Sequence, residues 1–512
     1  MRQQNLVPVA PQERIPTIDI IRGFALLGIL IINFTVDSID INLKDGLADQ
    51  LVYWTVRVFM DDRFQAIYCF LFGLGFALQM QRAVARNTFF GFAYLRRMIA
   101  LYLITIGVFI LTGDGYPVLP HYAMTGVLLL FFWRVPLKIL PFLALLFYLL
   151  SQTKDIIVNM RAEQKPVAII KTNAVDTTLH MKVDSAILDK YVGVYQGAAT
   201  TVFRRSNDSL FGVKAEAQFY LTPLTDTQFI RKDSNHIISF RKDSTAHFNI
   251  FVATVNGKQV PARRIQMDLQ QALKGINKQK DISYAEFVKK NAIKYRNLQK
   301  RWGRVDMVLK QLGYMLGYIL VLFLLGMYAG KRKIFHDVNS NKSFLRKVFK
   351  WGMVIGSPGI IFEIGYQAWK LINDIEFIHH SPVVRILINL PWDVGIILMA
   401  MAIIAGLTLI LEDPVWKKRL SFFVPVGRLG LTNYILLLFA NMIIFNNVSW
   451  FFGLKAGCFH RLLIGIAFFV ILYFFSKSWL KYFRQGPFEW LWRSLTYLKF
   501  QPVRLKLTDP SG

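Results

Sequence analysis

Residues 14–33 of the chain, RIPTIDIIRGFALLGILIIN, place one acid and one base, Asp19 and Arg22, directly before a long apolar run. Residues 23–36 carry no charge, and with the three isoleucines before Arg22 they reach about the length that crosses a bilayer. Because Asp19 and Arg22 are three residues apart, a helix places them on one face at the membrane boundary. Ionisable groups there are functional candidates, with a cytoplasmic anchor as the alternative interpretation of Arg22.

The composition predicts a polytopic membrane protein whose partner is the lipid bilayer. Of the 512 residues 54% are hydrophobic and 14% are aromatic, more apolar side chain than a soluble domain accommodates. The net charge of +29 is typical of basic cytoplasmic loops, and no nucleic-acid-binding module is found, so we expect no nucleic acid. Cys69 and Cys458 lie in or beside apolar runs and predict neither a disulfide framework nor a metal site.

Hydropathy predicts ten transmembrane helices, five in an N-terminal half (residues 1–151) and five in a C-terminal half (residues 306–480). Loops rich in arginine and lysine are assigned to the cytoplasm, which also places both termini there. A segment at residues 47–60 is expected to lie flat on the membrane. The expected spans are residues 18–36, 64–80, 98–112, 118–133, 139–151, 307–328, 352–372, 386–411, 431–445 and 462–475.

Residues 152–305 have the composition of a soluble, β-rich insert. Alternating runs predict strands, among them residues 201–204 and 237–241, and Asn256-Gly257 predicts a hairpin turn. Ten spans with both termini in the cytoplasm put the insert outside, which is the periplasm if the source is a Gram-negative bacterium. Its basic, helix-like tail at residues 284–301 opposes this, because positive charge prefers the inside, but long translocated domains escape that rule. Residues 481–512 form a basic cytoplasmic tail.

Four motifs resemble those of the YeiB-like bacterial inner-membrane proteins, also called domain of unknown function 418. They are DIIRGFALLGI at residues 19–29, RFQAIYCFLFGLGF at 63–76, LGMYAGKR at 325–332, and GRLGLTNY at 427–434 followed by GPFEWLWR. The resemblance covers most of the chain outside the insert. Within the insert, LDKYVGVY at residues 188–195 is similar to a lipocalin-like domain (domain of unknown function 3471) found behind serine β-lactamase-like enzymes.

The Asp-x-x-Arg-Gly opening also resembles that of transmembrane acyltransferases, which include the acyltransferase-3 proteins and the lysosomal heparan-glucosaminide N-acetyltransferase. This resemblance implies transfer of an acyl group from cytoplasmic acyl-CoA to an envelope glycan or lipid headgroup. Acyl-CoA is then a co-substrate, and no permanently bound cofactor is expected. Two alternatives stay open: a transporter or exporter of a small envelope metabolite, and a non-catalytic envelope sensor that binds through the insert.

Acyl transfer of this kind needs basic groups for the phosphates of the donor and a base for the acceptor. The donor-binding candidates are Arg22, Arg428, Asn433 and Tyr434, whereas Arg96 and Arg97 are interpreted as anchors. Asn33 is a candidate for orienting the acyl carbonyl, with a bond to a neighbouring helix as the alternative.

Asp114 and His121 are the candidates for the catalytic base, since the pKa of histidine suits proton transfer near neutral pH. Relatives have a shorter gap between Gly-Asp and Tyr-Ala than this chain has between Asp114 and Tyr122. A structural histidine at the mouth of a span is the alternative interpretation of His121.

Four further ionisable residues lie in or beside predicted spans, namely Asp19, Arg63, Glu363 and Asp393. Such groups mark a proton or substrate path, or pair with one another; Arg385 is a possible partner of the last two.

His379-His380 lacks a second pair of ligands, so no metal is expected. Glu489 and its tryptophan neighbours predict an amphipathic segment anchored on the lipid surface. The sequence does not fix the oligomeric state.

Overall fold

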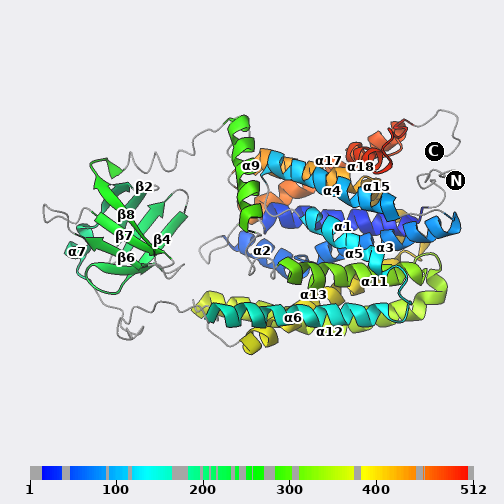
Figure 1. Cartoon of the computed structure of the whole chain (residues 1–512), viewed down its shortest axis with the longest axis horizontal. Coiled ribbons are helices and arrows are strands. Elements are labelled where there is room, and N and C mark those ends of the chain that lie inside the picture. The colour runs from blue at the N-terminus through cyan, green and yellow to red at the C-terminus, as the bar shows by residue number, and fades with distance from the viewer. Residues whose placement is uncertain are drawn as a thin grey trace. The chain divides into compact units, whose positions relative to one another are not determined.

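The computed structural model contains a helical unit and a β-barrel unit, which are described separately (Figure 1). The barrel unit is formed within residues 163–283 and the helical unit by the rest of the chain. The structure describes residues 14–36, 46–87, 91–113, 118–163, 183–196, 200–206, 209–214, 217–231, 237–241, 250–255, 258–269, 283–301, 311–373, 382–445, 454 and 456–504.

The helical unit is a bundle whose long helices run roughly side by side (Figure 1). Before the insert the helices are α1 (Pro16–Thr35), α2 (Leu47–Phe59), α3 (Arg63–Ala85), α4 (Gly91–Thr112), α5 (Val118–Phe132) and α6 (Leu140–Glu163). After it come α9 (Tyr284–Arg301), a π-helical turn (Met315–Ile319), α11 (Leu320–Lys331), α12 (Val338–Asn373), α13 (Pro382–Ile410), α14 (Pro414–Arg419), a 3-10 turn (Leu420–Phe422), α15 (Phe423–Arg428), α16 (Gly430–Phe445), α17 (Cys458–Tyr482) and α18 (Pro487–Tyr497).

Every expected span coincides with a helix, but the expected number of ten transmembrane spans is not confirmed. Among the described residues six helices are long and apolar enough to cross a membrane, or seven if α14–α15 and α16, bent by 76°, form one broken span. The apolar parts of α5 and α6 are shorter, at residues 119–132 and 140–152. The chain is therefore a membrane protein, and the side and depth of the shorter helices stay predictions.

Small residues bring the central helices into close contact. A β carbon at Gly326 of α11 would collide with the Phe70 carbonyl of α3, and one at Gly73 would collide with the Phe323 carbonyl. Membrane helices often associate through small residues because these let the backbones approach. The α3–α11 pair forms the centre of a continuous apolar core.

The barrel unit is a closed, antiparallel barrel of eight strands, each paired with the next and β1 paired with β8. The expected strands are present within it, and the hairpin at residues 256–257 is supported by the pairing of Val255 with Lys258 on either side. The strands are β1 (Gly193–Gln196), β2 (Thr200–Ser206), β3 (Ser209–Lys214), β4 (Ala217–Pro223), β5 (Gln228–Arg231), β6 (Ile237–Arg241), β7 (Ile250–Val255) and β8 (Lys258–Ile265).

Aromatic rings fill the interior of the barrel. Phe203 is completely buried and lies 5.2 Å from Phe240 and 5.1 Å from Phe251, measured between ring centroids. Tyr195 packs edge-on against Phe203 at 5.4 Å and donates a hydrogen bond to the Tyr191 carbonyl. Small barrels of eight strands either close around side chains in this way or hold one small ligand.

Candidate functional site

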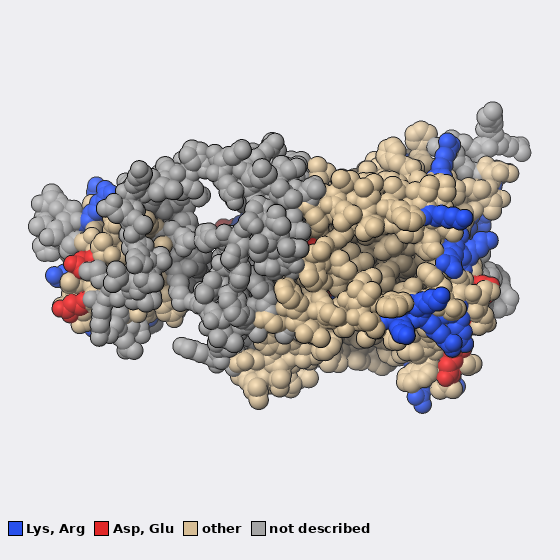
Figure 2. Space-filling view, turned by 90° about the horizontal axis from the view of Figure 1, so that it is seen from below, with Lys and Arg blue, Asp and Glu red and all other residues tan. Residues whose placement is uncertain are grey.

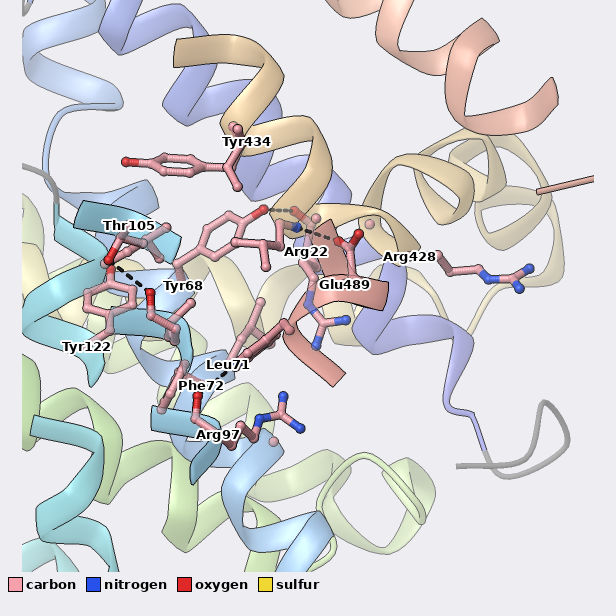
Figure 3. Close-up of a pocket in the computed structure, with 18 of the residues that line it drawn as sticks. Arg22, Tyr68, Leu71, Phe72, Arg97, Thr105, Tyr122, Arg428, Tyr434 and Glu489 are labelled. Carbon is pink, nitrogen blue, oxygen red and sulfur yellow. Dashed lines mark hydrogen bonds between the residues drawn. The ribbon is translucent and has the colours of Figure 1, made fainter. Parts of the chain in front are cut away.

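The helical unit contains a cavity of about 820 Å³ whose walls come from α1, α3, α4, α5, α15, α16 and α18 (Figure 3). Both Ile18 and Asn33 of α1 line it, and these residues are about 22 Å apart along a helix axis. The cavity therefore extends along most of the length of a transmembrane helix. Figure 3 shows tyrosines from α3, α5 and α16 on one side of the view and three arginines on the other.

One end of the cavity is strongly basic. The arginines there come from the segment before α1, from α1 itself, from the C-terminal end of α3, from the first half of α4, and from α15 and α18. Lysines and arginines gather at one end of the helical unit, and the middle of the visible face carries almost no charge (Figure 2). The arginines that line the cavity are Arg14, Arg22, Arg82, Arg86, Arg97, Arg428 and Arg493.

The first family motif and the C-terminal signature meet at this basic end. A β carbon at Gly427 would collide with the Asp19 carbonyl of α1, so only glycine allows the two segments to touch here. Arg22 donates to Asp19 over 3.2 Å, and the Tyr68 hydroxyl donates to the Arg22 carbonyl over 3.1 Å. Two motifs separated by some four hundred residues in the sequence thus form one wall of the cavity.

The structure assigns Arg97 to the cavity, whereas the sequence favoured a simple anchor. Its guanidinium donates to the Gln79 side-chain oxygen over 3.0 Å and lies 4.0 Å from the centre of the Trp492 ring. The Trp492 indole in turn donates to the Arg97 carbonyl over 2.7 Å. These contacts fix α18 against α4 and orient the Arg97 side chain towards the cavity.

Glu489 holds the N-terminal end of α16. Its carboxylate accepts from the backbone N–H groups of Leu431 and Thr432, over 2.7 and 3.1 Å, and from the Thr432 hydroxyl. Helix N-termini carry unpaired donors and a partial positive charge, which a carboxylate satisfies. Burial raises the pKa of Glu489, and the hydrogen bonds from Thr432 and Leu431 oppose that rise. The sequence predicted that Glu489 belongs to a segment anchored on the lipid surface. In the structure its carboxylate lines the cavity.

The opposite end of the cavity is lined by amides, hydroxyls and two acids. Asn33 is there, and its side chain donates to the Ile29 carbonyl over 2.9 Å. Asp61 forms an ion pair with Arg57, and Asp62 adopts a left-handed backbone conformation with φ of 58°. The Tyr318 hydroxyl holds the Asp62 carbonyl over 2.9 Å. This end offers hydrogen-bond partners rather than a concentration of positive charge.

The structure thus brings together part of the predicted site. Asp19, Arg22, Asn33, Arg428 and Tyr434 all line the cavity. Their chemical roles stay predictions, because the geometry shows where they lie and not what they bind.

Other predicted residues lie outside the described lining. His121 is buried beside Tyr314, with ring centroids 5.7 Å apart. Asn433 is buried and donates to the Val426 carbonyl and the Ser476 hydroxyl, so its side chain bonds neighbouring helices. Arg63 is completely buried, donates to the Asp61 carbonyl, and faces the Trp392 ring at 5.1 Å. Asp393 accepts from Gln152 over 3.5 Å.

Some predictions fall on residues that the structure does not describe. Asp114 and His379-His380 lie outside the described ranges, as do the side chains of Glu363 and Arg385. Within the described part of the chain, no group of three or more histidine, cysteine or acidic residues is arranged to hold a metal ion.

Sequence reasoning missed several residues of the cavity. Arg82 and Arg86 are four residues apart in sequence, a spacing that places two side chains on one helix face. This spacing could have indicated that both arginines face the same site. Glu489, Trp492 and Arg493 gave no such signal, because only the return of α18 onto α4 and α16 brings them to the cavity.

Comparison with known families divides the cavity wall into two parts. Residues 14–174, which contain α1, α3, α4 and α5, match the catalytic region of heparan-alpha-glucosaminide N-acetyltransferase. Residues 329–499, which contain α15, α16 and α18, match the protein family of unknown function DUF418. No solved structure matches the chain.

Three bacterial proteins are similar in sequence. The uncharacterized protein YxaH of Bacillus subtilis is 24% identical, and the match covers 98% of this chain and 99% of YxaH. An uncharacterized 39.9 kDa protein from the amylase 3' region of Bacillus acidopullulyticus is 23% identical, with 98% of each chain covered. The uncharacterized protein YeiB of Escherichia coli is 43% identical over 75 residues, which are 14% of this chain and 18% of YeiB. The chain is thus a membrane protein that is similar to YeiB over part of its length, with a region similar to DUF418 at its C-terminal side and a region similar to an acetyltransferase at its N-terminal side.

Proposed function

We propose that the chain transfers an acyl group from cytoplasmic acyl-CoA to a hydroxyl or amine of an envelope glycan or lipid headgroup, across the inner membrane of a bacterium. The observation that carries the proposal is the single cavity with seven arginines at one end and amides and hydroxyls at the other. Its walls are shared between the region similar to an acetyltransferase and the DUF418 region. In this proposal both termini are cytoplasmic and the barrel is periplasmic.

The basic end suits a donor that carries several phosphates. Guanidinium groups bind phosphate through short, charge-assisted hydrogen bonds and stay protonated when partly buried. Glu489 already occupies the N-terminal end of α16, so the phosphates would be bound by arginine side chains and not by that helix terminus. The volume of about 820 Å³ lies in the range of sites that enclose a cofactor-sized molecule.

The reaction is the attack of the acceptor oxygen or nitrogen on the thioester carbonyl. A new bond to the acyl carbon forms, the carbon–sulfur bond breaks, and the CoA sulfur leaves and receives the proton that the acceptor loses. A base must remove that proton, and hydrogen-bond donors must stabilise the oxyanion. Asn33 and Tyr434 line the cavity with groups able to donate to an oxyanion. Asp114 and His121 stay the candidates for the base.

The first test is calorimetric binding of acetyl-CoA to the purified full-length protein in detergent. We expect saturable binding that weakens about tenfold or more in Arg86→Ala and in Arg97→Ala, since a charge-assisted hydrogen bond contributes about 1.5–3 kcal/mol. The matched control is Arg96→Ala, because Arg96 is the exposed neighbour of Arg97 and does not belong to the described lining. Absence of binding by a folded wild-type sample would overturn the proposal.

Export is the second candidate, because the cavity extends along most of a transmembrane helix. The two functions differ in whether a covalent bond is made. With isotopically labelled acetyl-CoA and an envelope fraction, acyl transfer moves the label to a glycan or lipid, whereas an exporter leaves it on CoA. Asp393, which the sequence placed on an export route, does not belong to the described lining. A non-catalytic sensor that binds its ligand through the insert would need an apolar pocket inside the barrel. Among the described residues, aromatic rings fill that interior.

A further inference from the structure

The helix that follows the barrel, α9, carries an unusual concentration of positive charge. Its sequence, YAEFVKKNAIKYRNLQKR, contains six basic residues and one acid, Glu286. This charge is difficult to reconcile with a position outside the cytoplasm, because positive charge prefers the inside. The cavity and the proposed acyl transfer give it no role.

One face of α9 is attached to the end of α4 by specific contacts. The Tyr284 hydroxyl donates to the Leu111 carbonyl over 3.2 Å, and the Asn291 side chain donates to the Ile110 carbonyl over 3.2 Å. A third contact joins the Tyr295 and Tyr102 hydroxyls, which are 3.3 Å apart. Residues 284, 287, 291 and 295 recur every three or four positions, so this face is the packed face of an amphipathic helix.

Two of these contacts place α9 beside the C-terminal end of the apolar helix α4. The apolar helix α4 ends at Thr112, and α9 binds the carbonyl groups of the two residues before it. Figure 1 shows α9 lying across the long helices instead of along them. The basic end of the cavity is at the other end of the bundle, because Arg97 lies fifteen residues before Thr112 in α4. A helix that crosses a span at its end lies at the level of the lipid headgroups.

The opposite face of α9 presents its basic side chains to the surroundings. Lys289, Lys290, Lys294 and Arg296 are exposed, and Ile293 between them is 44% exposed. The Lys294 ammonium lies 5.8 Å from the centre of the Phe109 ring of α4, so this lysine lies next to the span. Lysine and arginine side chains near the end of a span direct their stems along apolar surface and their charges towards the headgroups.

We propose that α9 is a docking helix for the anionic phospholipid headgroups that surround the protein, and that it holds the end of α4 at the membrane surface. The partner follows from charge complementarity: four exposed cations and an exposed isoleucine at headgroup level match a surface of phosphates above acyl chains. The inference does not depend on the proposed acyl transfer, since α9 would bind lipid whether or not the cavity binds acyl-CoA.

Limited trypsin digestion of the full-length protein in lipid nanodiscs tests this inference directly. Trypsin cleaves after lysine, so its rate at Lys289, Lys290 and Lys294 measures their accessibility. Lys190 in the barrel unit is also exposed and serves as the internal control in the same digest. We expect discs with one third phosphatidylglycerol to slow cleavage in α9 about threefold or more relative to cleavage after Lys190, compared with discs of phosphatidylcholine alone. Half-molar salt should reduce this protection, because it screens exposed charges. Equal relative rates in both kinds of disc would overturn the proposal.

A variant provides a second readout that does not depend on cleavage. We expect Lys289→Gln/Lys290→Gln/Lys294→Gln to retain fewer phosphatidylglycerol molecules per protein than the wild type, counted by mass spectrometry after purification from mixed lipid. Lys417→Gln/Lys418→Gln in α14, where both lysines are exposed, is the matched control for loss of charge elsewhere. The proposal is wrong if the α9 variant and the α14 variant retain the same number of anionic lipids as the wild type.

Discussion

Replacement of Glu489 tests how the C-terminal helix is held in the cavity wall. In Glu489→Ala the N–H groups of Leu431 and Thr432 lose their acceptor at the start of α16. Loss of a capping acceptor costs about 1–2 kcal/mol, and a buried polar group left without a partner costs a similar amount. Because water in the cavity can replace part of the bonding, we expect the free energy of unfolding to fall by about 2 kcal/mol, roughly thirtyfold in the unfolding equilibrium.

Glu489→Gln should behave differently, since an amide oxygen can still accept these bonds. Burial raises the pKa of Glu489 above its ordinary value, so the native state holds this proton more tightly than the unfolded chain does. A group whose pKa is higher in the native state loses stabilising effect as the pH rises through that pKa. We therefore expect the wild type to gain stability relative to Glu489→Gln as the pH falls from 8 towards the ordinary range of a carboxyl group, because the glutamine does not titrate.

Urea unfolding of the detergent-solubilised protein at pH 5 and pH 8 measures these differences. The matched control is Glu412→Ala, because Glu412 is exposed and no hydrogen bond to its side chain is found among the described residues. The reasoning fails if Glu489→Ala unfolds at the same urea concentration as the wild type. It also fails if Glu489→Gln is as unstable as Glu489→Ala.

Three other substitutions test separate features. Asp62→Gly should be about 1 kcal/mol more stable than Asp62→Ala in thermal unfolding, because only glycine adopts the left-handed conformation at this position without strain. Phe203→Ala should destabilise the barrel by about 3–5 kcal/mol, seen as early proteolysis of residues 183–269 in the full-length protein, whereas the exposed Tyr220→Ala should not. Gly427→Ala should separate α15 from the Asp19 carbonyl and abolish acetyl-CoA binding, whereas Gly107→Ala, where a methyl group meets open space outside the described lining, should bind normally.

The helices could be located from the sequence because a local property defines them. An apolar run long enough for a bilayer is visible without any tertiary contact, and each expected span indeed falls on a helix. The number of spans could not be settled in this way, since the apolar parts of α5 and α6 are short and α14–α16 are bent. In the insert, alternation predicted the strands, but closure of the barrel depends on the pairing of β1 with β8, whose register is not encoded locally.

The candidate site was predictable where its residues lie in the family motifs and not elsewhere. Arg22 and Arg428 come together because the glycine of one motif packs against the backbone of the other. From the sequence, Arg97 was interpreted as an anchor. Its place in the cavity depends on a contact with Trp492, which is 395 positions away in the chain. A long-range contact of this kind leaves no periodicity in the sequence, so hydropathy and charge alone could not distinguish Arg97 from Arg96.

The position of α18 in the cavity wall has a consequence for the biogenesis of the protein. Glu489, Trp492 and Arg493 leave the ribosome more than 450 residues after Arg22 of α1. At about 5–20 residues per second this delay lasts on the order of half a minute or longer. During that time the nascent chain already has Arg22 and Arg97 in place without the helix that covers them. The cavity wall is therefore complete only after α18 has been synthesised and has packed against α4 and α16.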